Sequence, residues 1–206
     1  FREWIGAQIR ADMWGYVTPG WPEKAAEMAF RDASISHTKN GVYGAMFVAA
    51  LLAASFATSN IKAVIDIALS EIPANCRLAQ AVKDTMAWAE ANDDWQDTWA
   101  LVNEKFGHYP DVHTINNAAL IVMGLVHGKG NFEQTIVTTV LGGWDADCTG
   151  ATAGSVIGLI LGAKALPEKW VGVFNDQIHS AVRGYEHCRF SDLAQRTCRF
   201  ADANRP

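Results

Sequence analysis

The 206-residue sequence has no excess of basic residues, no C-x-x-C pair and no convincing alternation of apolar and polar residues. Its 17 Lys and Arg side chains stand against 22 Asp and Glu, which gives a formal charge of -5. A nucleic-acid or anionic-membrane partner would require a basic surface, so this balance argues against both. The four cysteines are scattered, and a chain of this length buries a core without disulfides. We therefore expect reduced thiols and a cytoplasmic protein.

The sequence also lacks an apolar run long enough to cross a bilayer. Residues 151–165 are strongly apolar but too short for a span. Gly150, Gly154, Gly158 and Gly162 recur at every fourth position along this stretch, so one helical face carries no side chains. We expect a neighbouring backbone to approach that face closely, as in a central helix surrounded by others.

Helical spacing extends over almost the whole sequence. The run from Gly41 to Phe56 is rich in Ala, Leu and Met, which indicates a buried helix. Asn60 is expected to cap the next helix, and Pro73 to end it. Expected helices cover residues 41–56, 61–72, 76–92, 94–106, 113–126, 131–140, 149–166, 168–182 and 191–204. Because their connections are short, we predict an all-α fold, a compact bundle of packed helices.

Residues 1–22 are the exception to the helical pattern. They hold three of the eight tryptophans together with glycine and proline, and we interpret them as an ordered loop. Such a loop either lines a site or packs a chain end against the core. No Pro- or Ser-rich linker divides the chain, so we expect one domain over residues 1–206. The chain starts at Phe1 without a leader, so we expect that something upstream has been removed or that the chain is a piece of a longer protein.

The clearest chemical motif is GGWDADCTGATAG, residues 142–154. Asp145 and Asp147 directly precede an expected helix N-terminus. One alternative is a helix cap made by Asp147 or Thr149, which would suit the helix dipole. The other is a Mg²⁺ site, because a hard cation takes oxygen ligands on a tightly turned backbone. One cap explains only one of the two carboxylates, and the spacing alone leaves both alternatives open.

Several segments together resemble the ADP-ribosylglycohydrolase family. Residues 142–163, GGWDADCTGATAGSVIGLILGA, resemble its GGDxDT signature followed by a Gly/Ala-rich helix. Residues 32–38, DASISHT, resemble its Asp-x-x-x-(Ser/Thr)-His motif, and residues 5–10, IGAQIR, resemble its glycine-rich substrate loop. Residues 131–136 match the helix that precedes the metal motif, so the resemblance covers nearly the whole chain.

This resemblance implies an all-α bundle that binds two Mg²⁺ ions, or Mn²⁺, in a central cleft. It also implies hydrolysis of the glycosidic bond between ADP-ribose and a protein side chain or small acceptor. Asp145 and Asp147 then correspond to metal ligands. The family's third ligand is a Thr directly after the second Asp, where this chain has Cys148, and a thiol suits a hard ion poorly. Thr149 or a backbone carbonyl therefore substitutes, or one metal is held more weakly.

Substrate binding and the rest of the active site follow from the same resemblance. His37 corresponds to a histidine that contacts the phosphate-ribose portion. Gly6, Ala7 and Gln8 match the loop whose backbone N–H groups hold the ADP moiety. The family's Thr-Asp-Asp metal cluster and its acid beside the attacking water would lie upstream of Phe1. We therefore expect the general base there, and these residues alone to be an incomplete and inactive site.

A second function class is a relative without turnover. A structural or ADP-ribose-binding protein, similar to the J1-type crystallins, would explain Cys148 in place of Thr and the missing first metal cluster. The retained Asp-x-Asp pair disfavours it. The sequence decides neither the acceptor on ADP-ribose nor the oligomeric state.

Four further groups of residues have both a structural and a functional interpretation. Asn116 and Asn117 either line the cleft or satisfy buried backbone in a helix capped by Thr114, and we favour the second. Cys148 is interpreted as a packing residue rather than a nucleophile, because two adjacent carboxylates raise a thiol pKa. The histidines share no ligand spacing, so no zinc site is predicted from them. Aromatic residues of the N-terminal stretch either stack on an adenine or pack against the core, namely Trp14, Tyr16 and Trp21.

Overall fold

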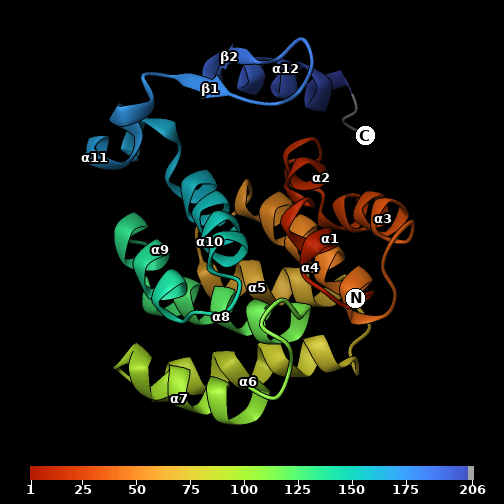
Figure 1. Ribbon diagram of the computed structural model, residues 1–206, viewed down its shortest axis with the longest axis vertical. Coiled ribbons are helices and arrows are strands. Elements are labelled where there is room, and N and C mark those ends of the chain that lie inside the picture. Colours follow the sequence, from red (N-terminus) through yellow and green to blue (C-terminus); the bar gives the residue numbers. More distant parts are fainter. Residues whose placement is uncertain (204–206) are drawn as a thin grey trace.

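Helices make up most of the protein over residues 1–203, which the computed structural model describes (Figure 1). The first part of the chain forms α1 (Gly6–Ile9), α2 (Asp12–Tyr16), α3 (Pro22–Ala33), α4 (Asn40–Ser55), α5 (Ile61–Ser70), α6 (Arg77–Ala91) and α7 (Trp95–Phe106). The second part forms α8 (Thr114–His127), α9 (Phe132–Leu141), α10 (Ala146–Leu161), α11 (Glu168–Val171), β1 (Gln177–His179), β2 (His187–Arg189) and α12 (Phe190–Ala203). Short 3-10 turns cover Ala163–Ala165 and Gly172–Phe174. The predicted all-α class is confirmed.

Helix α4 lies at the centre of the core. Its side chains are apolar on every side, and Phe47, Leu51 and Leu52 are fully buried. A helix that is apolar all round has to be covered all round. Helices α1, α2, α3, α5, α8 and α10 contact it. The motif-bearing segments α1 and α10 are therefore both held against one buried helix.

Most helix boundaries follow the capping chemistry that the sequence indicates. The Asn60 side chain accepts a hydrogen bond from the Ala63 N–H at 3.0 Å, so the predicted cap of α5 is confirmed. Helices α6 to α9 begin within one residue of their expected starts. Helix α10 begins at Ala146, three residues earlier than predicted. The C-terminal helix was expected to reach Asn204, which lies outside the described residues.

Several stretches depart from the predicted secondary structure, one of them residues 22–33, where α3 forms although no helix was predicted. The N-terminal stretch is not a loop, because α1 and α2 form within it. Residues 168–182 are not one helix: α11 ends after one turn, and an antiparallel hairpin follows in which His179 pairs with His187. Asn175 and Asp176 have φ values of 46° and 61°, a left-handed conformation that stops a helix. A three-residue strand is too short to show alternation in a sequence.

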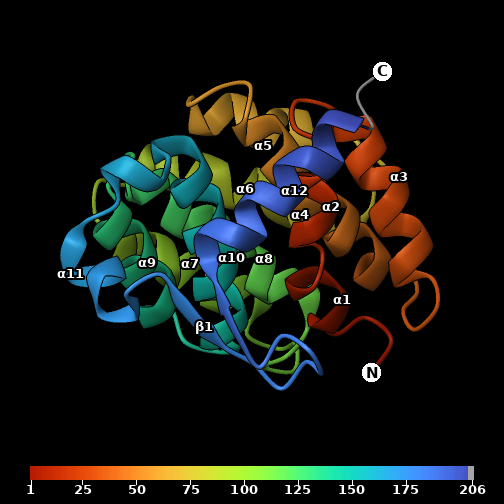
Figure 2. The ribbon, with the colours of Figure 1, turned by 90° about the horizontal axis from the view of Figure 1, so that it is seen from above.

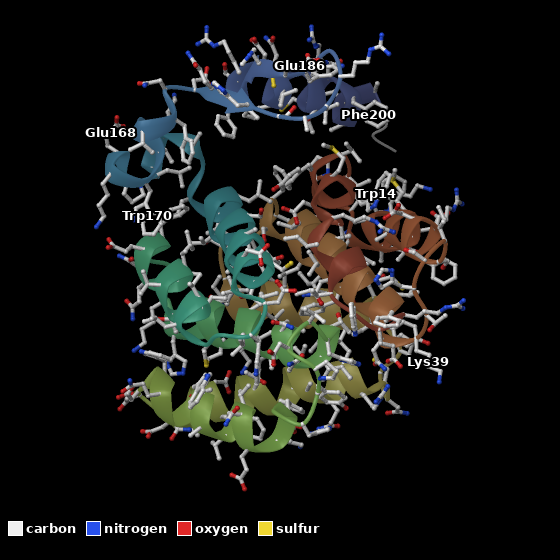
Figure 3. The ribbon with its side chains drawn as sticks, in the orientation of Figure 1. Trp14, Lys39, Glu168, Trp170, Glu186 and Phe200 are labelled. Atoms are coloured by element: carbon white, nitrogen blue, oxygen red, sulfur yellow. The ribbon has the colours of Figure 1, made fainter. Side chains whose placement is uncertain are left out.

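The C-terminal segment, residues 163–203, contacts α9 and α2. The Trp170 ring, which is labelled in Figure 3, lies edge-on to Phe132 of α9 with ring centroids 6.0 Å apart. Lys169 forms an ion pair with Glu133. Helix α12 then crosses above α2 and contacts it (Figure 2). Among residues 1–203, no helix has both the length and the apolar character needed to cross a membrane.

The glycine-rich face of α10 does not receive a neighbouring backbone. A Cβ added at Gly150 would lie 2.8 Å from the Val140 side chain, and one at Gly154 would lie 3.6 Å from Ile136. Within the described part of the chain, a Cβ at Gly158 would meet no atom within 4 Å. The prediction of close backbone packing along this face is therefore wrong. The buried side of α10 is instead formed by residues such as Val156 and Ile157.

Candidate metal centre

The turn between α9 and α10 places the Asp-x-Asp motif. Gly143 has a φ of 83°, which favours glycine, and Trp144 follows with a φ of 52°. A left-handed tryptophan is strained, so the surrounding contacts have to hold it in place. Trp144 packs against the core, and the indole N–H of Trp99 donates to the Gly142 carbonyl at 2.9 Å. The turn is therefore fixed before the first carboxylate.

Asn117 of α8 fixes the first aspartate itself. Its side-chain oxygen accepts from the Asp145 N–H at 3.1 Å, and its amide donates to the carbonyls of Asp111 and His113. Asn117 is fully buried. The prediction that Asn117 satisfies buried backbone and does not line the cleft is thus confirmed, and one of the backbone groups it satisfies belongs to the metal motif.

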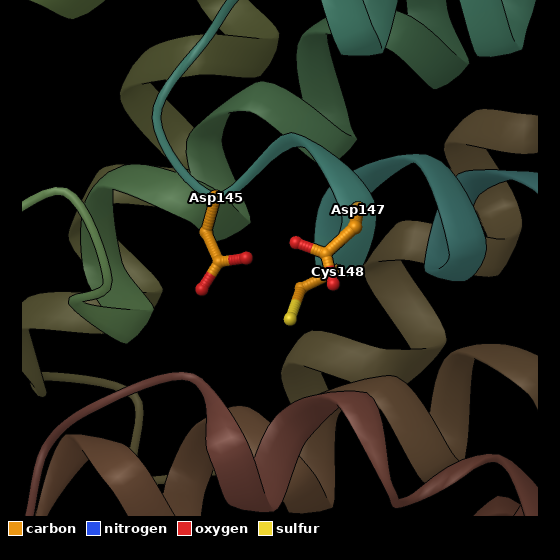
Figure 4. A group of neighbouring side chains, drawn as sticks. All are labelled: Asp145, Asp147 and Cys148. Carbon is orange, nitrogen blue, oxygen red and sulfur yellow. The ribbon is translucent and has the colours of Figure 1, made fainter.

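The start of α10 brings three possible metal ligands together. Asp145 occupies the N-cap position, and Asp147 and Cys148 lie in the first turn. One ligand atom from each of these residues lies within 4.8 Å of the other two. Figure 4 shows the two carboxylates facing each other, with the Cys148 sulfur beside the gap between them. Because the helix begins at Ala146, the alternative in which Asp147 or Thr149 is the cap residue is wrong.

The cluster has an unfavourable charge balance when no cation is bound. Burial raises the pKa of Asp145, and the neighbouring Asp147 carboxyl raises it further. Burial also raises the pKa of Cys148 to about 12, and its hydrogen bond to Asp145 acts in the same direction. The thiol therefore stays protonated at neutral pH, which agrees with the interpretation that it is not a nucleophile.

The donor set fits a divalent cation, but it fits Mg²⁺ only in part. The carboxylates of Asp145 and Asp147 supply the oxygen ligands that Mg²⁺ prefers. The sulfur of Cys148 is not a ligand that Mg²⁺ prefers. Thr149 is fully buried, and its hydroxyl donates to the Ala146 carbonyl at 3.4 Å. A lone pair remains on that oxygen, so Thr149 stays a predicted ligand.

The two segments predicted to bind substrate meet each other. The guanidinium of Arg10 donates to the Asp32 carboxylate at 2.8 Å and to the Ser36 hydroxyl at 3.1 Å. Ser36 in turn lies 2.8 Å from Nδ1 of His37. A Cβ at Gly6 would lie 3.7 Å from Nε2 of the same ring. Burial, followed by the charge of Arg10, lowers the pKa of His37, which favours its neutral form.

The predicted substrate loop is also tied to the core. The side chain of Gln8 is fully buried and accepts from the Thr114 hydroxyl at 2.6 Å. Ala7 is fully buried as well. Helix α1 contacts both α4 and α10, so the loop and the metal motif lie on adjacent elements. The contacts described leave the backbone of Gly6, Ala7 and Gln8, and the buried Gln8 Nε2, which has no hydrogen-bond partner among residues 1–203; the role of these three residues stays a prediction.

The predicted cap of α8 is wrong, and a contact between the two predicted substrate-binding segments was not predicted. The cap of α8 is His113, whose side chain accepts from the Ile115 N–H, and not Thr114. Thr114 lies at the first helical position and is engaged with Gln8 instead. The contact of Arg10 with Asp32 and Ser36 was also missed. A lone Arg beside an apolar segment gives little indication of a partner 26 residues away.

A second buried polar cluster joins α2 to α10. The Asp12 carboxylate accepts from the hydroxyls of Ser155, at 2.5 Å, and Tyr16, at 3.0 Å. Its other oxygen is buried and has no hydrogen-bond partner among residues 1–203. Tyr16 and Trp14 also pack against the core, which favours the packing alternative for these aromatics.

This cluster predicts a pH-dependent stability. Burial raises the pKa of Asp12, so the folded state binds its proton more tightly than the unfolded state. The charged form then costs stability once the pH exceeds the ordinary Asp value of about 4. We expect the free energy of unfolding of Asp12→Asn, relative to the native protein, to rise between about pH 3 and pH 7. Urea unfolding of both proteins at several pH values measures this difference in the free energy of unfolding. The exposed Asp93→Asn is the control, and an equal trend in both variants would contradict the prediction.

A comparison with protein families agrees with these motifs. A family model described as ADP-ribosylglycohydrolase matches residues 3–202. Neither the curated proteins nor the solved structures give a significant match. The matched residues include the Gly6–Gln8 loop, His37 and the Asp145–Asp147 motif.

Proposed function

The chain belongs to the ADP-ribosylglycohydrolase family, and from this premise we propose that it hydrolyses the glycosidic bond between ADP-ribose and an acceptor. The acceptor is a protein side chain or a small molecule. The observation that carries the proposal is the convergence of Asp145 and Asp147 at the start of α10, beside α1. The family match indicates glycohydrolase chemistry on ADP-ribose, and this convergence supports a role for metal in it.

The two carboxylates would hold the cation. Asp145 and Asp147 are the residues we assign to Mg²⁺, with Thr149 as a further ligand and Mn²⁺ as an alternative ion. A bound divalent cation would neutralise negative charge on phosphate or ribose oxygens. The N-terminus of α10 adds a favourable dipole for the carboxylates. The buried Asn117 contact keeps the Asp145 backbone in place.

The substrate would be held by α1 and by the His37 segment. A neutral His37 ring offers one donor and one acceptor for the ribose-phosphate portion. Ser36 lies against Nδ1, so Nε2 is the nitrogen that remains on the side of Gly6. The backbone N–H groups of Gly6, Ala7 and Gln8 would meet phosphate oxygens, a contact that small residues permit. Binding through metal and backbone groups agrees with the formal charge of -5.

A binding protein without turnover is the second candidate function. The observation that favours it is Cys148, whose thiol stands where the family pattern has a hydroxyl ligand. Such a protein would resemble the J1-type crystallins in having lost hydrolysis. It would not need the Asp145–Asp147 pair to bind a cation.

Calorimetric titration with ADP-ribose, with and without Mg²⁺, tests the proposal. We expect binding that requires the cation, since the carboxylates alone would repel the diphosphate. Binding that is indifferent to the cation would support the second candidate. Absence of binding under both conditions would contradict a site for ADP-ribose at α1 and α10.

A further inference from the structure

We infer that Cys148 is itself a metal ligand, and that its sulfur makes the site prefer a borderline divalent ion such as Zn²⁺ or Co²⁺ over Mg²⁺. This inference rests on the proposed function in one respect only: it needs Asp145 and Asp147 to bind a cation. The inference is a change in ion preference and not simply weaker binding of every ion, because a thiolate ligand strengthens the binding of some ions strongly and of others little.

The geometry places the sulfur in the cluster and not in the core. Asp145 and Cys148 are separated by three positions across the first turn of α10, which puts their side chains on the same side. The sulfur and the two carboxylates each offer an atom within 4.8 Å of the others (Figure 4). Ligands around a tetrahedral ion with bonds of about 2.0 to 2.3 Å stand roughly 3.5 Å apart, so small side-chain rotations suffice.

The chemistry of the donor set decides between the ions. Two carboxylates and a thiolate form a mixed oxygen and sulfur set, and Zn²⁺ accepts both kinds of ligand. Three protein ligands leave a further position for water or substrate, as in catalytic zinc sites. Mg²⁺ requires near-octahedral oxygen coordination and gains little from sulfur. On binding, the S–H bond is replaced by a sulfur–metal bond, and the proton passes to solvent.

Cobalt is the probe that reports the sulfur directly. Titration of the native chain with Co²⁺, in the absence of nucleotide, should produce a near-ultraviolet charge-transfer band from thiolate to cobalt. Cys148→Ser should lose this band and bind Zn²⁺ weaker by on the order of 100-fold. Its hydroxyl, like that of Cys148→Thr, offers an oxygen ligand, so both variants should shift the preference toward Mg²⁺. Displacement of bound Co²⁺ by Zn²⁺, and in a parallel titration by Mg²⁺, is followed as loss of the cobalt band. The two titrations give the preference of the native site.

Cys188→Ser is the matched control, because this half-buried cysteine follows His187 in the hairpin and could give a similar band. The inference predicts that the band persists in this variant. A band that survives Cys148→Ser overturns it, as does cobalt binding without a band in the native chain. If Mg²⁺-dependent binding of ADP-ribose is found without the band, the inference fails and the proposed function stands. If no divalent cation binds at Asp145 and Asp147, both fail.

Discussion

Replacing Asp145 with Asn stabilises the protein in the absence of metal and removes its stabilisation by a divalent cation. The first effect arises because burial and the Asp147 carboxyl raise the pKa of Asp145. An acid with a raised pKa costs stability at every pH above its unfolded value, and Asn carries no charge to bury. The second effect arises because Asn removes an anionic ligand. At a metal concentration 100 times the Kd, the native protein gains about 2.7 kcal/mol, and the variant should gain little.

Thermal unfolding with and without chelator measures both effects. Asp94→Asn is the matched control, because Asp94 is also an N-cap aspartate, and its carboxylate accepts from the Gln96 N–H at 2.9 Å. We expect this variant to keep the full metal-induced shift. A metal-induced rise in Tm that survives Asp145→Asn would contradict the assignment of Asp145 as a ligand. A lower Tm for the chelated variant would contradict the electrostatic argument.

The sequence predicted the helices that are built on local signals. Asn60 and the apolar run of α4 specify their elements through a side-chain cap and through burial, both of which act within a few residues. The predicted helix over residues 168–182 is wrong because the structure there depends on the left-handed conformation of Asn175 and Asp176. Their conformation is set by contacts such as the Asp176 carboxylate with Arg189 and Ser191, which come later in the chain.

The candidate site shows the same division between local and distant information. The Asp145–Asp147 motif is local, so spacing and resemblance located it. The neighbours that position it come from other helices: Trp99 and Asn117 contact the turn from α7 and α8. The glycine repeat of α10 was misread because periodicity shows which face lacks side chains. It does not show whether another helix approaches that face.

Asn117 provides the second large effect that we expect. It contacts neither carboxylate of the metal motif, yet its removal should weaken both the fold and the metal site. Asn117→Ala leaves the Asp145 N–H and the Asp111 carbonyl without their side-chain partner inside the protein. A buried group left without a partner costs about 1 to 3 kcal/mol, and because these two hydrogen bonds are only part-buried we expect a total loss of about 2 kcal/mol in the free energy of unfolding. The freed Asp145 backbone should weaken metal binding by about 10- to 100-fold.

Asn116→Ala separates these two effects. Asn116 is its fully buried neighbour: its amide donates to the Pro110 carbonyl at 3.2 Å and its side-chain oxygen accepts from the Asn117 amide at 3.4 Å, while its own hydrogen bonds do not reach Asp145. The same truncation there creates a similar cavity and should cost about 1 to 2 kcal/mol while metal affinity is retained. Urea unfolding gives the stabilities, and calorimetric metal titration below the unfolding transition gives the affinities. Equal metal affinity in the two variants would show that the Asp145 N–H needs no anchor. The carboxylates would then be positioned by the start of α10 alone, because the strained Trp144 turn and the helix would hold the motif without help from α8.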